Sequence, residues 1–170
     1  MFIRYEKIHR LGKEETEGIL EGTCYIQEKI DGANTSIWVE DGEIKCGSRN
    51  NVLESGFNGF VDYVKNHEGI NTLLKKHPEY RLYGEWCVRH TIQYNETSHK
   101  KFYLFDIMIK DSDFYEIPQV YVTAEKYGIN TPKLFDVIEN PTVEQVMKYV
   151  GMSAIGEIGE GVVIKNFMFV

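Results

Sequence analysis

Apolar residues change their spacing several times along the chain, and these changes divide it into predicted elements. Residues 24–30 form an apolar-leaning run, and residues 34–48 alternate apolar and polar positions on both sides of Asp41 and Gly42. Alternation is typical of strands, and an Asp-Gly pair supplies the positive φ angles of a tight turn. We therefore expect a strand over 24–30 and a hairpin over 34–48.

The period then changes to that of a helix. Phe57, Phe60, Val61 and Val64 are spaced as i, i+3, i+4 and i+7. This spacing places apolar side chains on one face of a helix, and it predicts an amphipathic helix over 57–66. The run "INTLLKKH" predicts a second helix directly after it.

Two later segments carry the signals of helix ends. The segment "VYVTAEKYG" indicates a helix closed by Gly128, since glycine adopts the left-handed conformation that follows many helices. The segment "PTVEQVMKYVG" has Thr142 and Gln145 at the spacing of a capping box, and Gly151 as its stop. We expect a helix in each.

Three further strands complete the pattern: "YRLYGEW", "KFYLFDIMI" and "GVVIKNF", the first two dense in aromatic and β-branched residues. Strands and hairpins are interleaved with helices without a strict βαβ alternation. This order predicts an α+β fold with mainly antiparallel sheets and flanking helices. A chain of 170 residues with 42% hydrophobic content builds one core, so we expect a single domain over 1–170.

Composition narrows the class of protein. The net charge of −7 argues against a general polyanion binder, although it leaves room for a local basic cleft. Cys24, Cys46 and Cys87 are odd in number and widely spaced, as reduced core thiols are. No stretch of 18 apolar residues occurs. We expect a soluble protein of the cytoplasm that does not engage a membrane, and a monomer.

Several familiar sites are absent from the sequence. There is no G-x-x-x-x-G-K-[ST] phosphate loop, no G-x-S-x-G elbow and no dinucleotide fingerprint, because "GEIGEG" has its glycines in the wrong order. The five histidines show no metal-ligand spacing with each other or with cysteine. These absences exclude several common classes of enzyme site.

Five short stretches remain as candidate chemistry: "EKIDGAN", "SRN", "YGEW", "FYLFDI" and "EGVVIKN". Taken alone, each has a plain explanation. Lys29 could be a surface lysine at the end of a strand, paired with a neighbouring acid, and Phe105 could be a core aromatic. The order and spacing of the five change this interpretation.

In that order, the five stretches resemble motifs I, Ia, III, IIIa and IV of the covalent nucleotidyltransferases, which include DNA ligases, RNA ligases and mRNA capping enzymes. The match runs from about residue 24 to 166. Asn34 and the "FYLFDI" strand most resemble the branch of nick-sealing RNA ligases. The resemblance implies a nucleotidyltransferase domain with an ATP-grasp-like ligase core.

The resemblance also implies a reaction and a nucleophile. In such enzymes the motif I lysine, here Lys29, attacks the α-phosphate of ATP and becomes a lysyl-adenylate. A lysine suits this role because its amine loses its proton when desolvated or placed near other cations. Asp31 and Gly32 would hold the loop of Lys29, with the glycine letting the backbone approach the phosphate.

The remaining roles follow from the same resemblance. Arg49 and Glu85 would contact the ribose, and Phe105 would stack on the adenine. Glu160 would hold Mg²⁺ or Mn²⁺, with Glu85 as a second carboxylate, because these cations prefer oxygen ligands. The expected nucleotide-binding residues are Glu28, Lys29, Ile30, Asn34, Arg49, Glu85, Phe105 and Lys165.

Two features qualify the match. Lys165 lies five residues after Glu160, and odd spacing in a regular strand places two side chains on opposite faces, so both reach one site only through a bulge, a twist or a strand end. The sequence also stops four residues after Asn166. We therefore expect a domain that lacks motif V and any C-terminal domain, either as a fragment of a longer ligase, which we favour, or as a minimal or degenerate member of the family.

Three functions stay open on the sequence alone. The first is an ATP-dependent RNA ligase core whose partners are ATP and RNA ends; the second is a DNA ligase core. The third is a nucleotide- or RNA-binding module with a ligase fold and no sealing activity. The stretch "EWCVRHTIQYNETSHKK" carries either substrate-facing residues, namely Arg89, His90, Lys100 and Lys101, or a polar surface loop.

Overall fold

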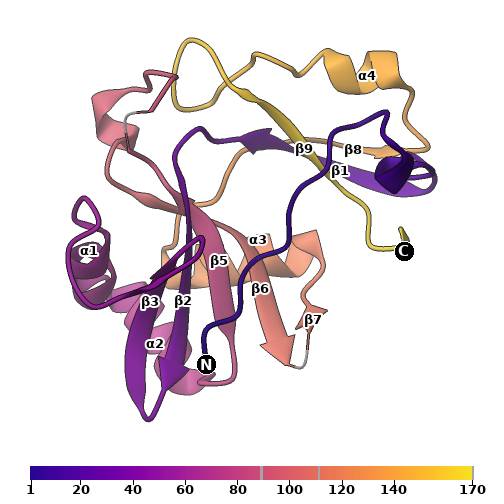
Figure 1. Ribbon diagram of the computed structural model, residues 1–170. Coiled ribbons are helices and arrows are strands. Elements are labelled where there is room, and N and C mark those ends of the chain that lie inside the picture. The colour runs from indigo at the N-terminus through magenta and orange to yellow at the C-terminus, as the bar shows by residue number, and fades with distance from the viewer. Residues whose placement is uncertain (89, 111, 170) are drawn as a thin grey trace.

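The chain folds into two antiparallel sheets (Figure 1). The computed structural model describes every residue except 89, 111 and 170. The large sheet has the order β4-β3-β2-β5-β6-β7, and the small sheet has the order β8-β1-β9. The strands are β1 (Thr23–Lys29), β2 (Ala33–Glu40), β3 (Glu43–Ser48), β4 (Val52–Leu53), β5 (Arg81–Trp86), β6 (Phe102–Lys110), β7 (Asp113–Phe114), β8 (Leu134–Glu139) and β9 (Gly161–Lys165). The α+β class with mainly antiparallel sheets is confirmed.

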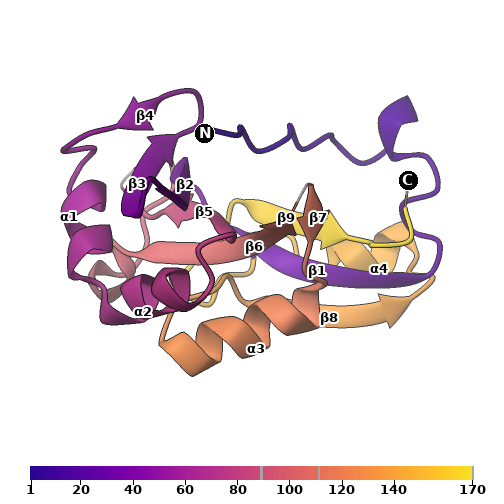
Figure 2. The ribbon, with the colours of Figure 1, turned by 90° about the horizontal axis from the view of Figure 1, so that it is seen from below.

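Four α-helices and two short 3₁₀ helices accompany the sheets in the described part of the chain. The α-helices are α1 (Phe60–Asn66), α2 (Glu68–Lys76), α3 (Ile117–Tyr127) and α4 (Val143–Met147), and the 3₁₀ helices are η1 (Glu14–Thr16) and η2 (Glu96–Ser98). Helices α1 to α3 cover one face of the large sheet, and α4 lies beside the small sheet (Figures 1 and 2). None of the described helices has the length and apolar character that a membrane crossing requires.

The main core lies between the large sheet and helices α1 to α3. Phe60, Leu73 and Val120 come from the three helices and are completely buried against Leu82 and Leu104 of the sheet. The apolar spacing of the sequence explains this arrangement, since each helix presents one apolar stripe to one sheet face. This packing fixes β5 and β6, whose opposite face contributes to the candidate site.

The turns and helix ends follow their local sequence signals. Asp41 and Gly42 adopt φ angles of 53° and 75° and connect β2 to β3. Gly128 closes α3 in the left-handed conformation. Thr142 and Gln145 form a complete capping box at the start of α4. The predicted hairpin and both capping signals are confirmed.

The structure corrects three of the predicted elements. The first helix begins at Phe60, because Phe57 and Asn58 adopt positive φ angles that a helix does not contain. Helix α4 ends at Met147 and the chain continues through turns to Gly151. Strand β8 was not predicted, because its residues are partly exposed and do not form an apolar run.

The N-terminal segment (residues 2–8) lies on the face of the large sheet opposite the helices (Figure 2). Its aromatic residues hold it there: Phe2 contacts Trp38, and Tyr5 contacts Tyr83 and Phe105. The segment therefore covers the sheet and reaches the edge of the candidate site.

Gly69 is expected to be required for the contact between α2 and the end of α3. A Cβ on Gly69 would lie 1.6 Å from the carbonyl oxygen of Tyr127, a backbone atom that cannot move aside cheaply. Alanine in place of glycine ordinarily stabilises a helix by about 0.5–1 kcal/mol. We predict the opposite sign for Gly69→Ala, a loss of about 1–3 kcal/mol, measured by urea unfolding. Gly161→Ala is the control, because no heavy atom lies within 4 Å of its Cβ position; an unchanged or raised midpoint for Gly69→Ala would contradict the prediction.

Candidate nucleotide site

A cavity of about 270 Å³ lies where the two sheets meet. It is lined by Ile8, Gln27, Glu28, Lys29, Ile30, Asp31, Gly32, Asn34, Arg49, Glu85, His90, Phe105, Pro132, Glu160, Val163 and Lys165. These residues come from the N-terminal segment, from β1, β2, β5, β6 and β9, and from the segments that connect the strands. All nine residues that the sequence assigned to nucleotide or metal binding are among them.

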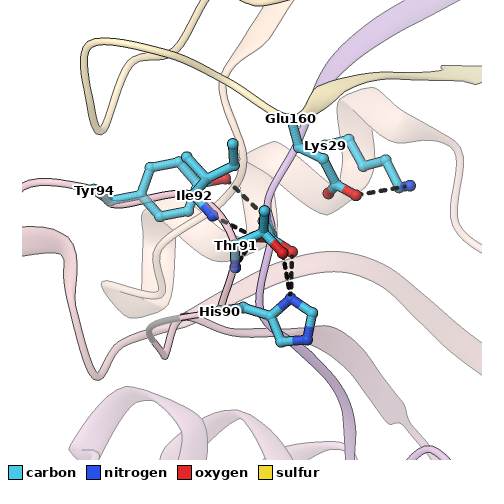
Figure 3. Close-up of polar contacts among 7 residues, drawn as sticks. Lys29, His90, Thr91, Ile92, Tyr94 and Glu160 are labelled. Atoms are coloured by element: carbon cyan, nitrogen blue, oxygen red, sulfur yellow. Dashed lines mark hydrogen bonds and ion pairs between the residues drawn. The ribbon is translucent and has the colours of Figure 1, made fainter.

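Lys29 is the last residue of β1 and points into this cavity. Its Nζ atom lies 3.2 Å from Oε1 of Glu160, and the two side chains are 45% and 33% exposed (Figure 3). An ion pair with this much exposure contributes about 1 kcal/mol or less to stability. The pair therefore holds Lys29 in place at rest, and little free energy is needed to separate it.

Both oxygens of the Asp31 carboxylate contact residues of the segment that connects β5 to β6. Its Oδ2 atom accepts hydrogen bonds from the backbone N–H groups of Thr91 and Ile92 at 2.8 and 2.7 Å, and its Oδ1 atom lies 3.0 Å from Nδ1 of His90. The N–H of Asp31 donates to the hydroxyl of Tyr94 at 2.8 Å. Asp31 thus anchors the 90–94 segment beside Lys29, a segment that is distant in sequence (Figure 3).

Gly32 is required by the packing of the backbone. A Cβ at this position would lie 2.4 Å from the carbonyl oxygen of Trp86. The sequence interpretation gave the close approach to a phosphate as the reason for this glycine, whereas the structure shows a close approach to the end of β5. Any larger residue would force the start of β2 away from β5.

Glu28 lines the cavity, but its carboxylate binds the loop that precedes β9. Its carboxylate accepts hydrogen bonds from Oγ of Ser153 at 2.6 Å and from the N–H of Ala154 at 2.9 Å. The side chain is almost completely buried. Since Glu160 follows in the same loop, Glu28 helps to position the carboxylate that pairs with Lys29.

Strands β1 and β9 present alternate residues to the cavity. Gln27 pairs with Val163, and Tyr25 pairs with Lys165, so the side chains of Gln27, Lys29, Val163 and Lys165 share one face. Glu160 lies before β9 begins, and the alternation does not apply to it. The strand end is therefore what allows Glu160 and Lys165 to reach one cavity in spite of their odd spacing.

Glu85 has an unusual electrostatic environment. Burial, followed by repulsion from Glu160, raises the pKa of the Glu85 carboxyl from 4.5 to about 8, although Arg49, the N–H of Gly32 and Lys29 act in the opposite direction. Two carboxylates in one partly dry cavity cannot both ionise at low cost. The cavity therefore favours the binding of a positive charge beside them.

A β-bulge in β6 directs Phe105 toward the cavity. Leu104 pairs with Gly84 and Asp106 pairs with Tyr83, so Phe105 is the extra residue of the bulge. As a result, the adjacent residues Phe105 and Asp106 lie on the same side of the sheet. Both contact Lys165: its Nζ atom forms an ion pair with Asp106 and lies 5.7 Å from the centre of the Phe105 ring.

Lys165 is held in a small buried cluster. Its Nζ atom donates to the hydroxyl of Tyr5, which in turn donates to Asp106. Burial and the Asp106 charge raise the pKa of the Tyr5 phenol well above its ordinary value, so it stays protonated. The N-terminal segment thus closes one side of the cavity, a role for which the sequence carried no signal.

The expected substrate-facing stretch is brought only partly to the cavity. His90 lines it, while Lys100 and Lys101 are exposed and do not. Arg89 lies outside the described residues. Ile8, Gln27, Pro132 and Val163 line the cavity but were not predicted, because they are separated in sequence and have no motif chemistry of their own.

The residues that are present suit a weakly held divalent cation. Within the described part of the chain, no three His, Cys, Asp or Glu side chains gather into a metal site. Glu85 and Glu160 nevertheless share the cavity and repel each other. Two carboxylates supply only part of the oxygen shell of Mg²⁺ or Mn²⁺, which would be completed by other oxygen ligands.

The fold is similar to that of solved RNA ligases. Naegleria gruberi RNA ligase with PPi matches with a TM-score of 0.74 and 21% identity over 96% of this chain and 54% of that chain. A mutant of the same ligase with ATP and Mn matches with a TM-score of 0.71 and 22% identity over 91% of this chain and 49% of that chain. Another mutant of the ligase, with AMP and Mn, matches with a TM-score of 0.72 and 22% identity over 89% of this chain and 48% of that chain. This chain spans about half the length of these ligases.

The fold and the lysine-bearing cavity define the class as an RNA ligase-like nucleotidyltransferase domain. The model of the RNA ligase family matches residues 22–168. The chain therefore belongs to the RNA ligase family. No curated protein matches it.

Glu85 is expected to make stability depend on pH. Between pH 4.5 and 8 the folded chain keeps the Glu85 proton that the unfolded chain releases, so the free energy of unfolding falls as pH rises through this window. One proton gives at most about 1.4 kcal/mol per pH unit. We predict that Glu85→Gln flattens this dependence and stabilises the protein at pH 8, measured by urea unfolding at pH 5, 6.5 and 8.

Glu43→Gln is the matched control for this measurement, because Glu43 is exposed and pairs only with Lys45. It should leave the pH dependence of the parent unchanged. Equal slopes for Glu85→Gln and the parent protein would show that Glu85 does not keep its proton in the folded state.

Proposed function

We propose that residues 1–170 are the adenylyltransferase domain of an ATP-dependent RNA ligase. The domain forms a covalent lysyl-AMP, transfers the AMP to an RNA 5′-phosphate and joins that end to a 3′-hydroxyl. The three buried, free cysteines are compatible with the reducing conditions of the cytoplasm, where we place this activity.

The observation that carries this proposal is the convergence of Lys29, Glu85, Phe105 and Glu160 on one cavity from four segments of the chain. A lysine paired with a carboxylate occurs on many protein surfaces and has no function of its own. An aromatic ring, two carboxylates and an arginine around the same lysine form the set of groups that a nucleoside triphosphate requires. Membership of the RNA ligase family supports the same function.

In the first step Lys29 is the nucleophile. Its Nζ atom attacks the α-phosphorus of ATP, a P–N bond forms, the bond from that phosphorus to the bridging oxygen breaks, and pyrophosphate leaves. Lys29 must lose a proton to attack, and its Nζ atom is held in an ion pair with Glu160 at 3.2 Å. The ion pair therefore has to separate before the attack. Because both side chains are partly exposed, the separation costs about 1 kcal/mol or less.

The rest of the cavity would hold the nucleotide. The Phe105 ring stacks on the base, while Arg49, Glu85 and the adjacent Asn34 lie where they can contact the ribose and phosphates. Glu160 and Glu85 would hold Mg²⁺ or Mn²⁺, which neutralises negative charge at the phosphates. Lys165 reaches the same cavity while paired with Asp106.

A DNA ligase core and a binding module without sealing activity are the competing functions. Family membership favours RNA over DNA ends. Incubation with α-labelled ATP and Mg²⁺, followed by denaturing electrophoresis, separates the enzymes from a binding module, because only a nucleotidyltransferase retains covalent label. Nicked duplexes with RNA or DNA at the 3′ end then separate the two ligases.

Replacement of Lys29 is predicted to abolish covalent labelling. Lys29→Ala removes the nucleophile, and Lys29→Arg fails because guanidinium stays protonated. The fold should persist, since a half-exposed lysine at a strand end contributes little packing. Lys45→Ala is the control, as Lys45 forms an ion pair with the exposed Glu43 and does not line the cavity. Labelling that survives in either Lys29 variant would reject this residue as the nucleophile.

Replacement of Glu160 is predicted to reduce adenylylation by about 10²–10³-fold, the loss typical of one group that stabilises transition-state charge. Raising Mg²⁺ should restore little, since the carboxylate also orients the ion. Glu157→Ala is the control from the same loop, because Glu157 is exposed and does not line the cavity. Full rescue of Glu160→Ala by excess Mg²⁺ would limit Glu160 to weak affinity for the ion.

A further inference from the structure

His90 lies at the mouth of the nucleotide cavity and contacts a buried carboxylate. Its side chain lines the cavity and is 64% exposed, whereas the side chain of Asp31 is 9% exposed. The Nδ1 atom of His90 lies 3.0 Å from Oδ1 of Asp31. The roles proposed above for the nucleotide site leave this ring unused, although histidine is the side chain that most often transfers protons in enzymes.

The contact with Asp31 determines where the imidazole carries its proton. A carboxylate oxygen accepts hydrogen bonds, so Nδ1 of His90 is the donor. The hydroxyl oxygen of Thr91 lies 3.4 Å from the same Nδ1 atom and can also accept from it. In a neutral ring with its proton on Nδ1, the Nε2 atom carries a lone pair. Asp31 therefore favours the tautomer whose Nε2 atom can accept a proton.

The Nε2 atom points away from Asp31 (Figure 3). Among the described residues, none forms a hydrogen bond with it. The carboxylate itself is held from its other side, because its Oδ2 atom accepts from the N–H groups of Thr91 and Ile92 at 2.8 and 2.7 Å. A fixed carboxylate thus orients the imidazole, as the buried aspartate of a Ser-His-Asp triad orients its histidine.

The other carboxyl groups of the described cavity wall are already engaged. Glu28 is bound to the loop that precedes β9, and Glu160 is paired with Lys29. Burial, followed by repulsion from Glu160, raises the pKa of Glu85 to about 8, so near neutral pH this carboxyl keeps its proton. Among the described residues of the wall, Nε2 of His90 remains as a basic atom that no other group occupies.

One nucleophile of the ligation sequence suits a base in this place. The 5′-phosphate that receives AMP is ionised near neutral pH and needs no base. The ammonium group of Lys29 is turned toward Glu160 (Figure 3). The RNA 3′-hydroxyl is neutral and must lose a proton to attack. It also comes from outside, because a polynucleotide cannot enter a cavity of about 270 Å³, so it meets the residues at the mouth.

We propose that Nε2 of His90 is the general base that accepts the proton of the RNA 3′-hydroxyl when this hydroxyl attacks the adenylylated 5′-phosphate. As the proton moves to Nε2, a bond forms between the 3′-oxygen and the phosphorus. The bond from this phosphorus to the oxygen of AMP breaks, and AMP leaves with the electron pair. Asp31 is the positioning residue that fixes the tautomer and stabilises the imidazolium. The inference rests on the proposed function, because it assigns a base to the joining step.

The first test isolates the joining step with RNA that is adenylylated beforehand. The full chain receives Mg²⁺ and a nicked RNA duplex whose 5′ end carries AMP, without ATP. In His90→Asn the amide nitrogen takes the place of Nδ1 and can still donate to Asp31, but the base is absent. We expect single-turnover joining to fall by about 10²–10⁴-fold, the usual contribution of a general base. Covalent labelling by α-labelled ATP should lose far less.

His99→Asn is the matched control for this measurement. His99 belongs to the same connection between β5 and β6, but it does not line the cavity. Joining by His99→Asn should equal that of the wild-type chain. Joining by His90→Asn at the wild-type rate would overturn the proposal.

Chemical rescue separates a base from a structural anchor. In His90→Ala, added imidazole should restore joining in proportion to its concentration, because the free base can enter the space that the side chain leaves. Failure of imidazole to restore any joining would limit His90 to a structural role and would overturn the proposal.

Asp31→Asn tests the tautomer. The asparagine oxygen can still accept from the N–H groups of Thr91 and Ile92, while its NH₂ group faces Nδ1 of His90 and moves the ring proton to Nε2. Joining should fall as in His90→Asn, and imidazole should not restore it, because His90 still fills its place. Joining at the wild-type rate would overturn the positioning role of Asp31.

The remaining outcomes separate the inference from the proposed function. Labelling of the wild-type chain together with equal losses of labelling and joining in His90→Asn would overturn the role of His90 as a base and leave the proposed function standing. A wild-type chain that is labelled but cannot join the adenylylated nick would overturn the inference and the joining step of the proposed function. A wild-type chain that does neither would overturn the proposed function and the inference with it.

Discussion

The passage of the chain from β1 to β2 is the constraint on which the rest of the site depends. β1 is the central strand of the small sheet and β2 is an inner strand of the large sheet, so the residues between them cross from one sheet to the other. Gly32 makes this crossing possible by its close approach to the carbonyl of Trp86. The three charged residues before it are each held by a different part of the chain: Glu28 by the 153–154 loop, Lys29 by Glu160 and Asp31 by the 90–94 segment.

This arrangement explains why charged residues occur at positions that are largely buried. The buried carboxylates of Glu28 and Asp31 accept hydrogen bonds from backbone N–H groups, which replace the hydrogen bonds to water that burial removes. Glu85 has fewer such partners, and burial and Glu160 outweigh the favourable effect of Arg49. The cavity therefore has a deficit of positive charge, and a triphosphate alone would increase the deficit. A divalent cation that enters with the triphosphate would remove it, which gives a physical reason for a cation requirement.

Local signals in the sequence were sufficient for many elements and insufficient for others. The turn at Asp41 and Gly42 and the capping box at Thr142 depend on residues a few positions apart, and the structure contains both. The partners of Asp31 lie about 60 residues further along the chain, and no local pattern encodes them. The bulge at Phe105 likewise depends on how β6 pairs with β5, because its apolar sequence fits a regular strand equally well.

The resemblance of five short motifs placed Lys29, Glu85, Phe105 and Glu160 in one site although periodicity alone could not have done so. The remaining lining residues, such as Ile8 and Val163, are apolar and carry no chemical signature. They became visible only when the pairing of β1 with β9 and the path of the N-terminal segment were known. Sequence therefore identified the groups that we propose to react, and the structure identified the groups that surround them.

The register of β1 connects these two sets of residues. Gln27 and Lys29 face the cavity, and Glu28 between them faces the loop that carries Glu160. A shift by one residue would exchange the faces of Glu28 and Lys29, because side chains alternate along a strand. The hydrogen bonds of Glu28 exist only in the observed register, and so do the amide contact between Gln27 and Tyr121 and the ion pair of Lys29. The same contacts that position Lys29, the proposed nucleophile, thus exclude the alternative pairing, and for this reason the anchoring residue Glu28 and Lys29 are neighbours in the sequence.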